Sequence, residues 1–192
     1  MGRSPLSFAL LRRRLDDMGH ITSSFGYSVS QQSLESIAAQ WVEHIQREVS
    51  PNERYAVIGH SLGGIITRLA SPSLPPGLSK FIMLAPPNRS PAAAQRLRHN
   101  RLFRLLTGDA GQKLGDPSFY STLPVPDVPT LVFAGTAAAG SLFHREGEVG
   151  DAVLSADETR LAGARHVEVR SIHTFIMNNQ DVTREIGEFL RQ

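Results

Sequence analysis

The apolar residues of this chain form short continuous runs separated by stretches of helical spacing. Three runs have the length and continuity of strands buried on both faces: 55–58, 81–84 and 130–133. Further strands are predicted at 166–170 and, as a short piece, at 20–27. Strands that alternate with helical stretches predict an α/β fold, with a mostly parallel sheet and helices on both of its faces.

Apolar residues recur at helical spacing in four segments. These helices are expected over 5–18 with Gly19 as the stop, over 33–49, over 65–70, and over a closing stretch whose face is Val182, Ile186, Phe189 and Leu190 behind an N-cap at Asp181. Trp41 falls on the apolar face of the second helix, so it is expected in the core. The 192 residues suffice for a single domain spanning 1–192 and are too few for two ordinary ones.

One segment departs from the alternation. Residues 88–124 are rich in arginine, glycine and proline, and they fit either a small cap over a site or a surface helix. In the second case the aliphatic stems of the arginines cover neighbouring leucines while the charged ends stay in water. The arginines concerned are Arg96, Arg98, Arg101 and Arg104.

Composition narrows the classes of function. The net charge of +2 is too mild to predict a nucleic-acid partner, although 18 of the 20 basic residues are arginine. The absence of cysteine excludes disulfides and thiolate chemistry. No apolar run of about 18 residues predicts a membrane span, and no signal peptide is visible, so a soluble protein is expected, with the cytoplasm as the default location. The oligomeric state is left open.

The turn between strand 55–58 and helix 65–70 has the sequence Gly59-His60-Ser61-Leu62-Gly63-Gly64. A serine held on a sharp strand-to-helix turn needs small residues two positions before and two positions after it, and Gly59 and Gly63 meet that need. The helix that follows directs the Leu62 amide toward the reaction centre as an oxyanion donor. His60 is expected to have a positional role. The alternative is a glycine-rich turn with an incidental serine.

The same hexapeptide resembles the turn that carries the nucleophile in bacterial lipases and esterases of the α/β-hydrolase superfamily. The resemblance implies a triad in the order Ser, acid, His, with the acid after the penultimate strand and the histidine after the last strand. His173 follows the strand at 166–170 and fills the base position. Five other histidines lie outside that loop: His20, His44, His99, His144 and His166.

The resemblance places the acid at Asp151, because residues 148–153 are similar to the Gly-Asp-Gly-x-Val loop of bacterial lipases. The chain departs from that pattern at Ala152, where the loop usually has glycine. Asp157 and Glu148 compete for the role, whereas Asp127 precedes its strand and lies at the wrong end of the sheet.

These residues predict a serine hydrolase that cleaves small-molecule or lipid carboxylic esters through an acyl-enzyme. No cofactor is expected. Some similar lipases hold calcium with an aspartate two residues after the histidine, but Phe175 occupies that position, so no metal is expected. An acyltransferase or thioesterase on the same residues stays open, because the pocket and not the triad selects the acceptor.

The resemblance also implies an earlier strand beside the one at 55–58, ending in a loop that supplies a second oxyanion donor. Residues 1–4 are similar to the tail of such a loop, which places that donor at Met1. The expectation is therefore either an enzyme whose chain continues upstream or an N-terminally truncated, inactive binding protein.

Overall fold

The computed structural model describes residues 5–29, 32–97, 109–139 and 149–192. Its centre is a four-stranded parallel sheet in the order β1-β2-β3-β6. The strands are β1 (Tyr55–His60), β2 (Leu78–Leu84), β3 (Thr130–Gly135) and β6 (Arg165–Val169). The parallel sheet confirms the prediction made from the continuous apolar runs. Within the described part of the chain, β1 lies at one edge of this sheet.

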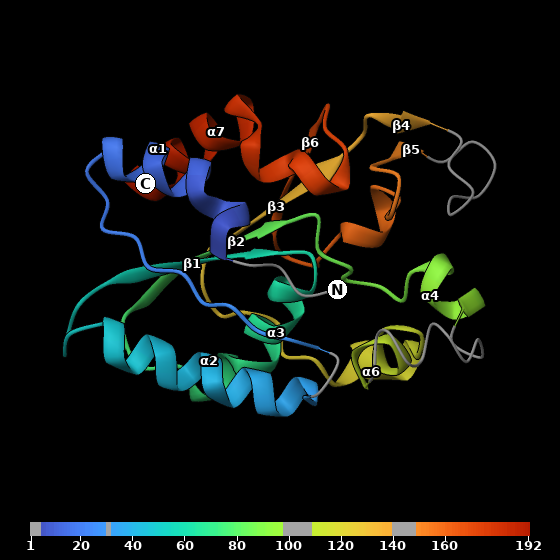
Figure 1. Ribbon diagram of the computed structural model, residues 1–192, viewed down its shortest axis with the longest axis horizontal. Coiled ribbons are helices and arrows are strands. Elements are labelled where there is room, and N and C mark those ends of the chain that lie inside the picture. Colours follow the sequence, from blue (N-terminus) through green and yellow to red (C-terminus); the bar gives the residue numbers. More distant parts are fainter. Residues whose placement is uncertain (1–4, 30–31, 98–108, 140–148) are drawn as a thin grey trace.

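Helices cover both faces of the sheet, as expected (Figure 1). On one face lie α1 (Ala9–Asp17) and α7 (Gln180–Arg191), and on the other lie α2 (Leu34–Glu48) and α3 (Leu62–Ala70). Leu11 and Ile186 of the first pair pack with Phe133 of the sheet in one buried cluster. On the opposite face, Ile37 and Ile65 belong to a second cluster. The sheet is therefore shielded from water on both sides.

Shorter elements complete the described chain. They are η1 (Pro5–Phe8), η2 (Ser71–Ser73), α4 (Ala92–Leu97), α6 (Pro117–Thr122), the antiparallel pair β4 (Ala138–Ala139) and β5 (Val149–Gly150), η3 (Asp157–Thr159) and η4 (His173–Asn178). Residues 109–114 are also helical. Among these, η4 and the loop after β5 carry two of the predicted site residues, and both lie beyond the carboxyl ends of the strands.

The strand predicted at 20–27 is wrong: these residues are described and form no strand. Their contacts are made by side chains instead of a backbone ladder. The Arg12 guanidinium donates to the Thr22 carbonyl and to the Ser24 hydroxyl, and the Phe25 ring packs on Trp41 with centroids 5.3 Å apart. Trp41 itself is half-buried and donates from Nε1 to Thr67 Oγ1 at 3.2 Å.

The N-cap predicted at Asp181 is also wrong. Asn179 is the N-cap of α7, and its side-chain oxygen accepts hydrogen bonds from the amides of Asp181 and Val182. The helix therefore begins one residue before Asp181. The Asp181 carboxylate lies in the first turn, where the positive end of the helix dipole favours a negative charge.

The described parts of segment 88–124 pack onto the core. Ala110, Leu114 and Leu123 are buried in the cluster that also contains Ile65 of α3. Arg98, Arg101 and Arg104 lie outside the described residues. A cap formed by this segment therefore stays a prediction. Among the helices that the structure describes, none combines the length and the apolar character needed to cross a membrane.

Candidate active site

Ser61 lies on a strained turn between β1 and α3. Its backbone has φ 51° and ψ −122°, a conformation that residues other than glycine rarely adopt. The Ser61 amide donates to the Leu84 carbonyl of β2 at 2.8 Å, which ties the turn to the neighbouring strand. The side chain is only partly buried, so its hydroxyl is open to a reactant. Strain of this kind concentrates at functional sites.

The glycines around Ser61 have different roles. A Cβ at Gly59 would lie 2.7 Å from the Gly64 amide nitrogen, so the close approach of strand and helix requires glycine there. A Cβ at Gly63 would lie 3.8 Å from the Tyr27 hydroxyl oxygen, which is an ordinary van der Waals contact. Gly64, which had no assigned role beyond the motif, would bring a Cβ to 2.8 Å from Met83 Cε. The need for small residues therefore falls on Gly59 and Gly64 more than on Gly63.

His173 is the first residue of η4, just beyond β6. Its Nε2 lies 3.0 Å from Ser61 Oγ, and its Nδ1 lies 2.7 Å from Asp151 Oδ2. Its side chain is 10% exposed and that of Asp151 is 1% exposed. A carboxylate only accepts hydrogen bonds, so Nδ1 carries the proton and, in the neutral ring, Nε2 is free to accept the Ser61 hydroxyl proton.

The Asp151 carboxylate is held by its own loop. One oxygen, Oδ1, accepts the backbone amides of Val153 at 3.0 Å and Leu154 at 2.8 Å, and the other faces His173. Gly135 of β3 has no room for a side chain here, because a Cβ would lie 2.6 Å from that of Asp151. The buried carboxylate therefore has partners for both of its oxygens, as burial of a charge requires.

Of the competing acids, the two that the structure describes lie away from His173. Asp157 is exposed and pairs with Arg89 at 2.8 Å and with Arg160 at 3.2 Å. Asp127 precedes β3 and so lies beyond the amino ends of the parallel strands, opposite Ser61. Glu148 lies outside the described residues.

Two further residues at this edge of the sheet have a positive φ. Ala152, in the loop of Asp151, has φ 80°, and Ala85, directly after β2, has φ 46°. The Ala85 amide donates to the Phe133 carbonyl at 2.8 Å. Ala152 is the position where the similar lipase loop has glycine, and its left-handed backbone gives the physical reason for glycine there.

One of the two predicted oxyanion donors can be located. Leu62 is the first residue of α3, and the amides of a helix's first turn find no acceptor within the helix. Its N–H follows Ser61 directly at the positive end of that helix. Met1 lies outside the described residues. The remaining residue of the turn, His60, is buried, and its ring centroid lies 4.9 Å from that of His173.

Sequence reasoning missed a buried cation on α3. The Arg68 guanidinium donates to the carbonyls of Leu123 and Pro124 and to Asn88 Oδ1, at 2.9 to 3.1 Å. Burial lowers the pKa of the Arg68 guanidinium, because removal from water disfavours its charged form. The helix α3, which follows Ser61, is thereby fixed to the chain leading into β3. The one signal for this role in the sequence is an arginine within an otherwise apolar helix.

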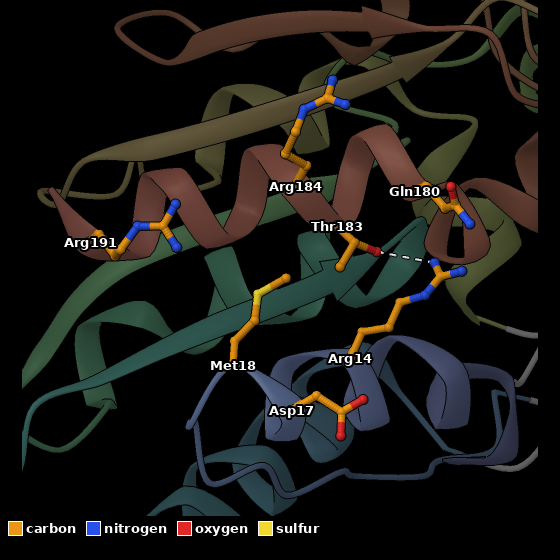
Figure 2. A pocket seen from close by; sticks show the side chains of 7 residues that line it. All are labelled: Arg14, Asp17, Met18, Gln180, Thr183, Arg184 and Arg191. Carbon is orange, nitrogen blue, oxygen red and sulfur yellow. Dashed lines mark hydrogen bonds between the residues drawn. The ribbon is translucent and has the colours of Figure 1, made fainter.

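A pocket lies between α1 and α7, on the sheet face opposite α2 and α3 (Figure 2). Its lining is Arg14, Asp17, Met18, Gln180, Thr183, Arg184 and Arg191. Arg14 donates across it to Thr183 Oγ1 at 3.2 Å and to the Asn178 carbonyl at 2.9 Å. None of the residues that meet at His173 lines this pocket, so the pocket is separate from the candidate site at Ser61.

No protein-family model and no curated protein sequence matches the chain. Solved structures do. A lipase, BlEst2, from Bacillus licheniformis superimposes with a TM-score of 0.58 and 17% identity over 83% of this chain and 74% of its own. The phospholipase PlaB from Legionella pneumophila gives 0.64 and 21% over 82% of this chain, but this is only 42% of PlaB.

A putative hydrolase of the α/β superfamily from Xanthomonas campestris covers 99% of this chain and 92% of its own, with a TM-score of 0.60 and 15% identity. At such identities the likeness is one of fold. It extends over nearly the whole chain.

Proposed function

We propose that this chain, which has the α/β-hydrolase fold, is a serine hydrolase that cleaves carboxylic esters. Ser61 is the nucleophile, His173 the general base and Asp151 the acid that orients it. The observation that carries the proposal is the unbroken chain of hydrogen bonds from Ser61 Oγ through both ring nitrogens of His173 to Asp151, with steps of 3.0 and 2.7 Å. A nucleophile, a base and an orienting group in hydrogen-bond reach are the geometric signature of covalent catalysis.

The first half of the reaction follows from the protonation states. His173 Nε2 takes the proton of the Ser61 hydroxyl as Oγ attacks the acyl carbonyl, and a tetrahedral intermediate forms. The ring then carries a positive charge beside the Asp151 carboxylate, which stabilises it. His173 gives the proton to the leaving alcohol, the bond from the acyl carbon to that alcohol breaks, and an acyl ester remains on Ser61.

Charge that develops on the carbonyl oxygen needs donors fixed in advance. The Leu62 amide is one, because it opens α3 next to Ser61 and has no helical acceptor. Such a donor contributes about 10²-fold or more to the rate. In the second half, His173 takes a proton from the water that attacks the acyl carbon. The bond to Ser61 Oγ then breaks, Oγ receives that proton, and the carboxylic acid leaves.

The substrate is proposed to be an ester with an apolar part. Two apolar side chains close in sequence to His173 are exposed, Ile172 at 40% and Phe175 at 57%. The apolar side chains of Ile65, Phe81 and Leu84 are at most 1% exposed, so they belong to the core and cannot contact a substrate. The names of the lipase and phospholipase neighbours agree with an apolar substrate.

Labelling with a fluorophosphonate probe tests the nucleophile. The wild-type chain is expected to label, and Ser61→Ala to lose labelling completely. Ser73→Ala is the matched control, because it makes the same chemical change at an exposed serine of η2 and should label like wild type. A folded wild-type chain that does not label, or a Ser61→Ala chain that does, refutes the proposal.

The acceptor is tested separately with p-nitrophenyl esters of increasing acyl length and with a matched thioester. Hydrolysis of the oxygen esters, abolished in Ser61→Ala, supports the esterase. Faster turnover of the thioester, or product that appears only when an alcohol acceptor is added, assigns the same residues to a thioesterase or an acyltransferase instead.

A further inference from the structure

His60 is the last residue of β1 and directly precedes Ser61. Its side chain is buried at 5% exposure, and its Nε2 lies 3.0 Å from the backbone carbonyl oxygen of His173. The two imidazole rings are inclined at 53° with centroids 4.9 Å apart, and the Phe8 ring approaches His60 edge-on at 6.5 Å. The residue before the proposed nucleophile thus contacts the main chain of the proposed base.

The direction of this hydrogen bond follows from its acceptor. A backbone carbonyl oxygen has no proton to give, so His60 Nε2 carries the proton and donates. This nitrogen is therefore occupied in a bond to the main chain. It is not available to take the Ser61 proton, whereas His173 Nε2 lies 3.0 Å from Ser61 Oγ.

The main chain of His173 is consequently held from two sides. Its amide donates to the Asp151 backbone carbonyl at 2.9 Å, and its carbonyl accepts from His60 at 3.0 Å. One bond comes from the loop that carries the acid and the other from the strand that carries the nucleophile. η4 is a single short 3₁₀ segment, whose own hydrogen bonds constrain its first residue weakly.

We propose that His60 is a positioning residue, which fixes the backbone of His173 so that Nε2 meets Ser61 Oγ. The inference rests on the proposed function for its catalytic meaning. A misplacement of about 1 Å at a reacting group can lower the rate by ~10²-fold. Loss of the His60 bond should therefore slow the chemical step and leave substrate binding nearly unchanged.

Two amide variants separate this role from a general need for a buried polar group. Glutamine places its side-chain nitrogen near the position of the histidine Nε2, whereas the shorter asparagine reaches only to about the position of Nδ1. His60→Gln should keep kcat within about threefold of wild type, while His60→Asn should lose roughly 10- to 100-fold in kcat with KM within about twofold. The rate of fluorophosphonate labelling should fall in parallel.

A proton NMR signal gives a readout that does not need turnover. The Nδ1 proton of His173, held by Asp151 at 2.7 Å, should appear far downfield in wild type and in His60→Gln, and should shift or broaden in His60→Asn. A folded His60→Asn chain with wild-type kcat and an unchanged signal overturns the proposal. The proposal is also overturned if His60→Asn and His60→Gln lose kcat equally and only in proportion to their loss of folded protein.

The same data distinguish failure of this inference from failure of the proposed function. Labelling of wild type without any difference between the two variants refutes the positioning role alone. Absence of labelling in wild type, with a His173 signal that responds to His60→Asn but not to His60→Gln, refutes the hydrolase and keeps the positioning role. If the asparagine variant does not fold, His60→Met has similar length and no donor, and wild-type labelling by it overturns the inference.

Discussion

Replacing Ala152 by glycine should stabilise the protein, although it removes a side-chain methyl group. Ala152 has φ 80° in the loop that holds Asp151. A left-handed conformation costs a residue with a Cβ about 1 to 2 kcal/mol, and glycine avoids this cost. Against it, glycine gives the unfolded chain more freedom, which costs about 0.4 to 1 kcal/mol, and the half-buried methyl contributes roughly 0.4 kcal/mol.

The net change in the free energy of unfolding is small, so Ala152→Gly is best compared with the same substitution at a second alanine. Ala162 lies in an exposed turn and is not among the residues with positive φ. Ala162→Gly therefore suffers only the entropic cost of about 0.4 to 1 kcal/mol. The two variants should differ by about 1 kcal/mol in the free energy of unfolding, with Ala152→Gly the more stable, which corresponds to about 2 to 4 °C in Tm for a chain of this size.

Urea unfolding and thermal unfolding of both variants beside wild type give these values. An unchanged urea m-value would show that the substitutions changed the stability and not the surface exposed on unfolding. Equal destabilisation by the two substitutions would refute the reasoning, because it would mean that Ala152 carries no backbone strain.

Three further predictions follow from the site and its surroundings. Asp151→Asn should leave the fold intact and lower kcat for ester hydrolysis by about 10³- to 10⁴-fold, because the amide no longer imposes the productive tautomer. Gly59→Ala should sharply lower Tm and the yield of folded protein, whereas Gly63→Ala should fold, since a Cβ is excluded by backbone atoms only at the first position. Burial lowers the pKa of His166 below 6.5, so its contribution to stability is present above pH 6.5 and is lost as the pH falls below it; urea midpoints at pH 7.5 and 5.5 should differ less in His166→Phe than in wild type.

The strands of the sheet could be predicted from sequence because their environment leaves a strong pattern. Strands covered on both faces are continuously apolar, and Phe81–Leu84 and Leu131–Ala134 are all fully buried. The prediction of a strand at 20–27 was wrong because its aromatic residues are there to pack against other rings. The Phe25 ring packs on Tyr27 and Trp41, and the segment belongs to no strand ladder. A pattern of apolar residues does not distinguish the two cases.

The positions of Ser61 and His173 could be predicted because each follows a strand whose end is visible in the sequence, and that of Asp151 because its loop resembles the acid loop of bacterial lipases. The contacts of Arg68 and His60 could not be, since both residues bond to backbone carbonyls of distant segments. A carbonyl group has no sequence signature, so such partners appear only when the chain is folded. The N-cap of α7 could not be predicted for a different reason: Asn179 and Asp181 are both residue types that suit a cap.

The hydrogen bond between Ser61 and His173 joins residues 112 positions apart, which follow β1 and β6, the two outer strands of the described sheet. Closing so long a loop is entropically unfavourable, and contacts between residues that are close in sequence cannot offset that entropy. Ser61, the proposed nucleophile, is therefore expected to meet His173 only when β6 has joined the sheet. During refolding from denaturant, the recovery of probe labelling should lag behind the recovery of helical circular dichroism, and a chain whose last strand is detached should retain helices while its serine is inert.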